Sequence, residues 1–509
     1  MTPQKYYKRT CLFRQVYTLK YRHYLLINGN EMLLYSYNVI TKKEDYFMKY
    51  EFPENFKWGS AVWALGTEGC LNKGGRVPTV FDEYYRLQPE RFYNQVGPGE
   101  TLNWYEDYEK FAQLAKDISH NSFRTSILWA RLMPDGKTVN EEAVEFYRHL
   151  FQSFKNRGME LSIVLYWFDM PLPIEQQGGF RNREVISLFE QYCQNCFDLF
   201  DDLVDIWYIY NEPIVDVQLK YIYDTCYPNI CDFKLAQQVI YNMVVAHAKV
   251  VKNFNSKKRH GKIGSVMNIS QPYPRSQHLA DLKAKRNFEL LYILCFLEPL
   301  YNGRIHPEWI ELLNKYDLLP KIYDEDLKLI ADNKVQNIMG LNIYFPERIK
   351  CKEYLVNPES PLTFESFYDH YNMPGRQMNN DRGWEIYPRI MYDTLMWIKR
   401  DYGNIETRIT ENGIGIQNEY KFRNENGQIQ DDYRIDYVKK HLIWAHKAIE
   451  DGANLTGYNM WSFVDLWSPS NQFKNCYGFY EFDLKTKEVK KKKSADWFKN
   501  ITEENGFDE

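Results

Sequence analysis

The sequence predicts an α/β fold, a single (β/α)8 TIM barrel with loop insertions. Three observations support this prediction: strand-like apolar runs, amphipathic helical patterns that alternate with them, and a length of 509 residues. Strands that alternate with helices are typical of parallel β/α units. A chain of this length can form one barrel when its loops are long. We expect the barrel to cover residues 48–509.

Eight segments have the apolar, β-branched and aromatic composition of buried strands. They are Lys57–Val62, Ser122–Trp129, Glu160–Phe168, Asp205–Tyr210, Lys262–Asn268, Asn337–Tyr344, Glu406–Thr410 and Leu455–Phe463. Between them, apolar residues recur at helical spacing. These amphipathic segments include Asn103–Ile118, Asn140–Arg157, Arg183–Leu203, Leu235–Phe254, Trp384–Tyr402 and Asp432–Glu450. Because the active site of a (β/α)8 barrel lies at the carboxyl ends of its strands, residues just after a strand are the first candidates.

The first 47 residues differ from the rest of the chain. They are rich in Tyr and Lys, show no clean period, and precede a second plausible start at Met48. We predict that residues 1–47 are an N-terminal extension outside the barrel; the alternative is an ordinary ordered arm. Farther along, Leu279–Lys334 is expected to add helices, and the stretch from about Cys351 to Asp381 to form a loop over the mouth.

Composition excludes several classes of function. The formal net charge is -4, from 64 basic and 68 acidic residues, which gives no sign of nucleic-acid binding. The run Lys490–Lys493 stands alone and is interpreted as a solvated turn. The chain has no apolar run of 18 or more residues and no signal-peptide h-region, so we expect no membrane span.

Nine cysteines are scattered along the chain. Cys193 and Cys196 have C-x-x-C spacing, but they lie inside a helical pattern, and no second pair or nearby His completes a zinc site. We expect reduced, buried thiols and a cytoplasmic location.

Two short motifs at the ends of the fourth and seventh predicted strands carry the chemistry. Tyr210-Asn211-Glu212-Pro213 closes one strand and Thr410-Glu411-Asn412-Gly413 the other, so both glutamates would face the same mouth. Two carboxylates that face one bond are what glycoside hydrolysis needs, one as acid and one as nucleophile. Either motif alone could be a surface glutamate on a loop; the two in this order favour catalysis. No metal or organic cofactor is implied, because the carboxylate pair suffices.

Further motifs resemble the family-1 glycoside hydrolases, the group of β-glucosidases and 6-phospho-β-glycosidases. Phe52–Gly59 looks like the first strand of that family, and Phe123–Ser126 resembles the second. Gly340–Tyr344 resembles the sixth strand, and Gly383–Pro388 matches the segment before the sixth helix. The resemblance runs from Phe52 to about Gly506, nearly the whole chain after the extension.

The resemblance implies a retaining mechanism in which Glu212 is the acid/base and Glu411 the nucleophile. Retaining enzymes hold the two carboxyl groups about 5–5.5 Å apart, so that the nucleophile attacks the anomeric carbon directly. Arg124 and Tyr344 are similar to residues that hydrogen-bond the nucleophile, and they would keep it ionised. Asn342, in the same motif as Tyr344, is a further supporting residue.

The resemblance also assigns residues to the glycone, and two of them depart from the family pattern. Asn211 would bind the sugar 2-hydroxyl, and Trp461 would form an aromatic floor, unless it is a core tryptophan. The family's first strand carries a Gln that holds the 3- and 4-hydroxyls; here that position is Gly66. A His of the third strand is replaced by Trp167, whose N–H and ring face are expected to substitute in part.

One segment bears on a phosphate group. Ser468 stands where ordinary β-glucosidases of the family carry a Glu, and a carboxylate there would repel a 6-phosphate. The phospho-specific branch has a Ser, a Lys and a Tyr; Ser468 and Tyr477 match, but the lysine position is Asn475. Lys474, one residue earlier, could reach the dianion through its flexible stem, or it could be a solvated loop lysine. Pro469, where phospho-galactoside members carry Trp, favours 6-phospho-glucosides.

The sequence therefore predicts a retaining β-glycosidase that hydrolyses small 6-phospho-β-glucosides. Two alternatives stay open. One is a β-glycosidase for a neutral or unusual glycone, which Ser468 disfavours. The other is a weakly active pseudo-glycosidase retained as a binding or surface protein, which Gly66 and Trp167 favour. The aglycone and the oligomeric state are left open.

Overall fold

The computed structural model describes residues 11–28, 31–335, 337–354, 356–357 and 359–508, with side chains from Lys49 onwards. Its centre is a closed barrel of parallel strands in the order β14-β15-β3-β4-β5-β6-β7-β9. These strands are β3 (Lys57–Ala61), β4 (Ser122–Ser126), β5 (Glu160–Tyr166), β6 (Ile206–Asn211), β7 (Lys262–Asn268), β9 (Ile338–Asn342), β14 (Glu406–Glu411) and β15 (Leu455–Trp461). The predicted α/β barrel is confirmed.

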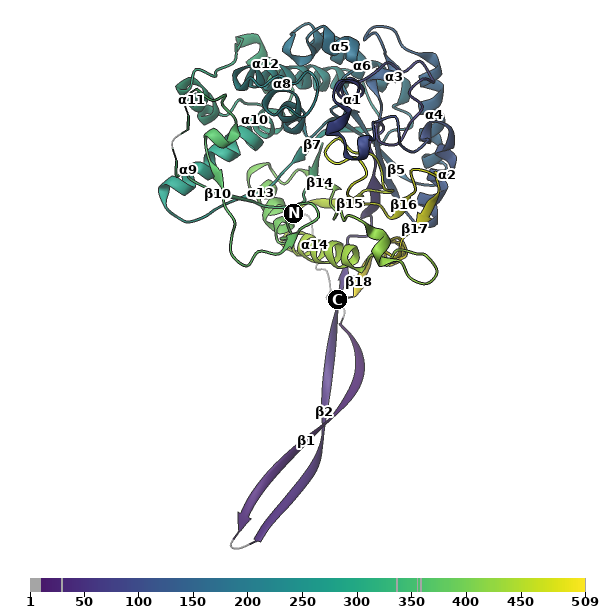
Figure 1. Cartoon of the computed structure of the whole chain (residues 1–509), viewed down its shortest axis with the longest axis vertical. Helices are drawn as coiled ribbons and strands as arrows, with labels where there is room; N and C mark the ends of the chain where they lie inside the picture. Colours follow the sequence, from purple (N-terminus) through teal and green to yellow (C-terminus); the bar gives the residue numbers. More distant parts are fainter. Residues whose placement is uncertain (1–10, 29–30, 336, 355, 358, 509) are drawn as a thin grey trace.

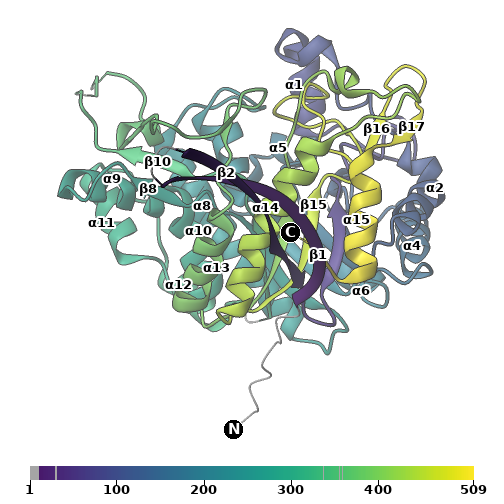
Figure 2. The same ribbon diagram turned by 90° about the horizontal axis from the view of Figure 1, so that it is seen from below.

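Helices surround the barrel, and their apolar faces pack against its outer surface (Figure 2). The main ones are α2 (Trp104–Asp117), α4 (Glu141–Lys155), α6 (Val185–Phe200), α8 (Phe233–Asn255), α13 (Ile390–Asp401), α14 (Asp432–Glu450) and α15 (Lys493–Glu504). Side-chain caps fix several starts: Asn140 accepts a hydrogen bond from the backbone N–H of Glu142 before α4, and Asp232 does the same for Leu235 in α8.

Three predicted boundaries differ from the structure for local reasons. β4 ends at Ser126, and Trp129–Leu132 forms the short helix α3. β5 ends before Phe168, which has a left-handed backbone with φ of 67°. The predicted helix Trp384–Tyr402 begins only at Ile390. Pro388 explains the late start, because the residue before a proline disfavours helical backbone.

The insertion after β7 contains the helices α9 (Leu279–Phe288), α11 (Pro307–Lys315) and α12 (Asp324–Asp332), as expected. The later insertion is a loop with short strands, β10 (Glu347–Lys350), β11 (Asp369–His370), β12 (Met378–Asn379) and β13 (Trp384–Glu385). The turn between β12 and β13 reaches the mouth of the barrel and carries Arg382.

The N-terminal region forms an antiparallel hairpin of β1 (Cys11–Asn28) and β2 (Glu31–Glu51), which the sequence did not predict. The hairpin projects away from the barrel (Figure 1). Only the end of β2, at Lys49–Glu51, pairs with β18 (Gly506–Asp508) beside the barrel. The assignment of residues 1–47 to a dispensable extension stays a prediction.

The interpretation of Lys490–Lys493 as a solvated turn is wrong for Lys492. The segment forms the end of β17 (Val489–Lys491) and the start of α15, and Lys492 is fully buried. Its Nζ lies 2.9 Å from a carboxylate oxygen of Asp465 and also pairs with Glu419. Local lysine composition could not reveal two carboxylates that come from other parts of the chain.

The thiols of Cys193 and Cys196 are free and buried in α6, as predicted. Burial raises the pKa of both thiols, which keeps them protonated. None of the helices in the described part of the chain combines the length and the hydrophobicity that crossing a bilayer requires.

Candidate active site

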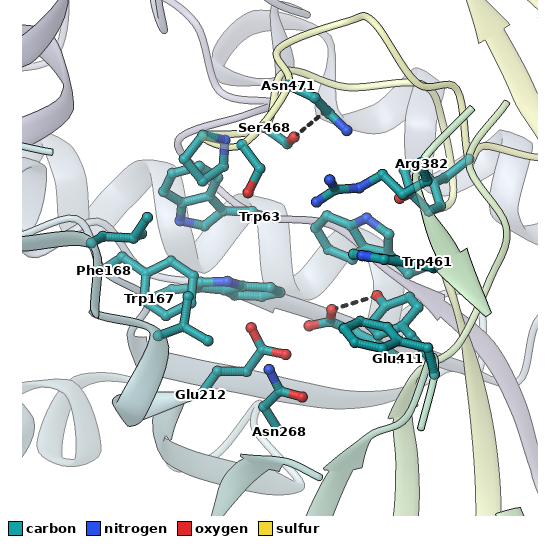
Figure 3. Close-up of a pocket in the computed structure, with 18 residues that line it drawn as sticks. Trp63, Trp167, Phe168, Glu212, Asn268, Arg382, Glu411, Trp461, Ser468 and Asn471 are labelled. Atoms are coloured by element: carbon teal, nitrogen blue, oxygen red, sulfur yellow. Dashed lines mark hydrogen bonds between the residues drawn. The ribbon is translucent and has the colours of Figure 1, made fainter. Parts of the chain in front are cut away.

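The two glutamates of the sequence motifs meet at the mouth of the barrel. Glu411 is the last residue of β14, and Glu212 follows β6 directly. Both line one pocket, and their carboxyl groups point toward each other across it (Figure 3). The backbone of Glu212 is left-handed, with φ of 45°, and its N–H donates to the carbonyl of Val266 at 2.9 Å. Such strained backbone is enriched at functional sites.

Glu411 is buried and held through both oxygens. Arg124 donates from Nη1 to Oε1 at 2.7 Å, and the hydroxyl of Tyr344 donates to Oε2 at 2.8 Å. Burial raises the pKa of Glu411, while the charge and hydrogen bond of Arg124 and the hydroxyl of Tyr344 oppose that rise. These contacts favour the carboxylate form at Glu411.

Glu212 has a poorer set of partners. Among the described residues, its carboxyl accepts one hydrogen bond, from Asn342 Nδ2 to Oε1 at 2.9 Å. Burial, and then the charge of Glu411, raise the pKa of Glu212 to about 8. The pair therefore shares its proton unequally, with Glu212 protonated and Glu411 ionised near neutral pH. An acid beside a nucleophilic carboxylate is the arrangement that a retaining glycosidase uses.

The side-chain amides of Asn211 and Asn342 are held in fixed orientations beside the two glutamates. The side-chain oxygen of Asn211 accepts hydrogen bonds from Arg124 and from Asn342 Nδ2. Asn342 is oriented in turn by Thr410, whose hydroxyl donates to Asn342 Oδ1 at 2.7 Å. The Nδ2 of Asn211 is buried and has no partner among the described residues. It is therefore a free donor beside Glu212, where a sugar hydroxyl would accept it.

Aromatic rings form one wall of the pocket. The ring centroids of Trp167 and Trp461 are 5.6 Å apart, and Trp63 lies 6.5 Å from Trp167. The guanidinium of Arg124 lies 4.2 Å from the Trp167 ring. Trp461 and Trp167 thus line the pocket, and their contact with a glycone stays a prediction. Trp63 was missed, although it stands three residues before Gly66 in the segment that follows β3.

Gly66 has no room for a side chain. A Cβ at this position would lie 2.4 Å from the carbonyl oxygen of Trp467 and 2.8 Å from a methyl group of Leu466. The loop after β15 occupies the space that a larger residue would fill. The polar glycone contact absent from the sequence is therefore replaced by packed backbone and by the rings of Trp63 and Trp467, whose centroids are 5.8 Å apart.

Ser468 and Tyr477 both line the pocket. The hydroxyl of Ser468 donates to Asn471 Oδ1 at 2.7 Å, and the ring of Tyr477 is buried against Gly415. Asn475 accepts a hydrogen bond from Asn471 and donates to the carbonyl of Asp381, so its amide holds the loop.

Lys474 is not among the residues that line this pocket. It is exposed, faces a neighbouring pocket, and its Nζ lies 5.9 Å from the ring centroid of Tyr93. A phosphate contact by Lys474 stays a prediction that its position does not favour. The pocket contains another cation that the sequence analysis missed, Arg382. The available signal was its place directly before the motif Gly383–Pro388.

Fold and site together define a (β/α)8 barrel of the glycosidase type. The chain belongs to glycosyl hydrolase family 1, whose sequence model matches residues 48–507. It is 42% identical to the 6-phospho-beta-glucosidase GmuD of Bacillus subtilis, over 90% of this chain and 99% of that protein. It is 32% identical to the 6-phospho-beta-galactosidase of Leptotrichia buccalis, over 90% and 99%.

The fold is also that of a solved family member. The structure of the beta-glucosidase from Thermotoga maritima in complex with glucoimidazole superimposes with a TM-score of 0.82 at 28% identity. The superposition covers 90% of this chain and 100% of that one.

Proposed function

We propose that this protein is a retaining β-glycosidase that hydrolyses 6-phospho-β-glucosides in the cytoplasm. The observation that carries the proposal is the set of side chains that line the pocket. The pocket is lined by a carboxylic acid and a carboxylate that face each other, and by the hydroxyls of Ser468 and Tyr477. Of the described residues that line the pocket, Glu212 and Glu411 are the only carboxylates, so none beside Ser468 would repel a phosphate.

The geometry supports a two-step displacement. In the first step Glu411 attacks the anomeric carbon, and Glu212 gives its proton to the glycosidic oxygen as the bond to the leaving group breaks. A covalent glycosyl-enzyme results. In the second step the ionised Glu212 takes a proton from water, the water oxygen attacks the anomeric carbon, and Glu411 leaves as a carboxylate. Asn211 Nδ2 would bind the 2-hydroxyl throughout.

The names of the relatives support the phosphate assignment. GmuD is named a 6-phospho-beta-glucosidase, and the Leptotrichia buccalis relative a 6-phospho-beta-galactosidase. A neutral glycone is the second candidate, because a relative from Acetivibrio thermocellus, 31% identical, is named a beta-glucosidase. The intact, unequally protonated pair argues against a pseudo-glycosidase.

A comparison of two substrates tests the proposal. We expect kcat/KM for nitrophenyl β-glucoside 6-phosphate to exceed that for nitrophenyl β-glucoside by about 100-fold, the effect of two charge-assisted hydrogen bonds. Ser468→Glu should reverse the preference, and Ser468→Ala, the matched neutral change, should only weaken it. A preference of the unchanged protein for the plain glucoside would support a neutral glycone, and binding without turnover would support a pseudo-glycosidase.

A second experiment tests the roles of the two glutamates. A 2-fluoro-β-glycoside with a good leaving group should trap the covalent intermediate. Mass spectrometry should find the sugar on the peptide that contains Glu411. A label on any other residue would contradict the assignment of the nucleophile.

A further inference from the structure

Arg382 is a cation in the pocket wall that no carboxylate of the described residues neutralises. The guanidinium carbon lies 4.2 Å from the centroid of the Trp384 ring, so the ring supports the group from one side. A hydrogen bond joins Arg382 to the side chain of Tyr477. Arg382 Nε is buried and has no partner among the described residues. Figure 3 shows the side chain above Trp461, on the side of the pocket where Ser468 and Asn471 lie.

The acidic residues nearest to Arg382 in sequence, Asp381 and Glu385, bond to other groups. Asp381 Oδ2 accepts a hydrogen bond from the backbone N–H of Gln417 at 2.9 Å. Glu385 forms a two-pronged pair with Arg348, at 3.0 and 2.7 Å. The turn between them is held by the bond from the N–H of Gly383 to the carbonyl of Asn379 at 2.8 Å. Arg382 is thus presented to the pocket by a fixed turn without a counter-charge of its own.

We propose that Arg382 is the cation that binds the 6-phosphate of the glycone, with Tyr477 and Ser468 as neutral donors beside it. This proposal rests on the proposed function. A planar guanidinium matches two phosphate oxygens at once, and a phosphate carries close to two negative charges at neutral pH. A neutral sugar has no group that requires a cation here, so a lone arginine in this wall favours an anionic substrate.

The donors beside Arg382 fit the same ligand. Arg382 donates to the phenol oxygen of Tyr477, which leaves the phenol proton free to donate to a phosphate oxygen. The hydroxyl of Ser468 now donates to Asn471, and it can turn to the phosphate in exchange for one neutral hydrogen bond. The exchange is favourable because hydrogen bonds to charged groups are stronger than neutral ones.

The positions of Arg382 and Lys474 show which of the two cations can contact a ligand in the catalytic pocket. Arg382 lines both the catalytic pocket and the neighbouring one, whereas Lys474 lines only the neighbouring one. Lys474 is exposed, so water would screen its charge. Arg382 is therefore the better-placed partner for an anion that must also reach Glu411.

The test compares three variants on nitrophenyl β-glucoside with and without a 6-phosphate. Arg382→Met should lower the ratio of the two kcat/KM values by roughly 10- to 100-fold, the range for a lost charge-assisted hydrogen bond. Arg382→Lys should lose less, because the charge stays and the planar fork is lost. Arg376→Met is the matched control: it removes an arginine of the same loop that lies outside the pocket and bonds to Asn372.

The ratio of the two kcat/KM values tests the role of Arg382 separately from the proposed function. Damage to the fold or to the glutamates would affect both substrates and leave this ratio unchanged. If the unchanged protein does not prefer the phosphorylated substrate, the proposed function fails. If it does prefer it and Arg382→Met keeps the ratio within about twofold, the assignment of Arg382 fails while the proposed function stands. A fall of the ratio in Lys474→Met but not in Arg382→Met would transfer the role to Lys474. Inhibition by inorganic phosphate that weakens in Arg382→Met would support the proposal independently.

Discussion

Two clusters of carboxylates in this protein differ in the number of cations that contact them. At the catalytic centre, Arg124 contacts Glu411, whereas Glu212 has the amide of Asn342 as its partner among the described residues. In the second cluster, an ion-pair network joins Glu419, Asp431 and Asp465 to Arg434 and Lys492. Glu411, Glu419, Asp431 and Asp465 are buried and Glu212 is half-buried, so the main difference between the two clusters lies in the partners.

The partners decide which carboxylates keep a proton. Burial alone would raise the pKa of Asp431, but the charges of Arg434 and Lys492 outweigh it, and the pKa is lowered. Burial raises the pKa of Asp465 to about 6, against the opposing charge of Lys492. Burial and the charge of Glu411 raise the pKa of Glu212 to about 8, because only a neutral amide contacts its carboxyl. Leaving Glu212 without a contacting cation is what makes it an acid.

The network also forms hydrogen bonds to the backbone of the loop that carries Ser468. Arg434 Nη1 donates to the carbonyls of Ile414 at 2.7 Å and of Tyr477 at 2.9 Å. Asp465 accepts a hydrogen bond from the N–H of Gly478 at 2.8 Å. Both ends of the loop that carries Ser468 are therefore fixed to buried charges, which holds its hydroxyl at the pocket.

The largest effect is expected where the catalytic centre is broken. Glu411→Gln should lower kcat by about 10⁴-fold or more, because it removes the nucleophile. It should also lower the pKa of Glu212, since the charge of Glu411 raises it. Steady-state kinetics and NMR titration of the labelled carboxyl measure the two effects. Glu406→Gln, at the other end of β14, is the control and should keep kcat; a similar loss there would point to damage of the strand.

Breaking the network should affect stability first. Lys492→Met would leave Glu419 and Asp465 buried with one cation fewer, which costs about 3–5 kcal/mol in comparable cases. Urea denaturation at pH 7 measures the change. Lys491→Met, one residue away, removes only a surface pair with Asp496 and should cost less than about 1 kcal/mol. Equal losses in the two variants would refute the buried role of Lys492.

The pH profile sharpens the comparison at Glu212. Because the acid must carry its proton, kcat/KM should fall about tenfold per pH unit above the pKa of Glu212, which is about 8. A plain glucoside with a poor alkyl leaving group is the right substrate, since it needs the acid and has no phosphate that titrates. A descending limb near pH 5 would mean that Glu212 is not perturbed.

The same pKa shift predicts a stability effect of opposite sense to that of a salt-bridged acid. The folded protein binds a proton at Glu212 that the unfolded chain, with the ordinary pKa of 4.5, releases earlier. Between these two values the folded state holds more protons, so its stability falls as the pH rises from about 4.5 to about 8. Glu212→Gln should be no more stable than the unchanged protein at pH 4, and more stable at pH 8. Thermal unfolding across this range measures the difference.

Sequence patterns were sufficient for the barrel and for the glutamate pair, because both follow from local periodicity and from motifs at strand ends. Trp63, Arg382 and Lys492 escaped prediction for a different reason. Each has a partner far away in sequence, and side-chain direction across elements leaves no local pattern. Lys474 was placed by its nearness in sequence to Asn475, and the loop turns its side chain away from the pocket. The N-terminal hairpin escaped prediction because the sequence of residues 1–47 shows no clean period.

The smallest effect is expected from a third region, residues 1–47. A protein that begins at Met48 keeps the pairing of Lys49–Glu51 with β18, and it keeps Phe52, which is buried against Trp58 with ring centroids 4.8 Å apart. We expect its Tm to change by less than about 1 °C, which corresponds to less than about 1 kcal/mol in a protein of this size, and its kcat/KM to change less than about twofold.

A protein that begins at Lys57 is the matched control for that truncation. It would lose Tyr50 and Phe52, which pack on Phe507 and Trp58, and the loss of a buried aromatic side chain costs about 3–5 kcal/mol. Thermal unfolding of both proteins, with kinetics on the same substrate, separates the two regions. A large loss in the protein that begins at Met48 would mean that residues 1–47 stabilise the barrel directly, and the boundary of the barrel would then lie earlier in the chain than Met48.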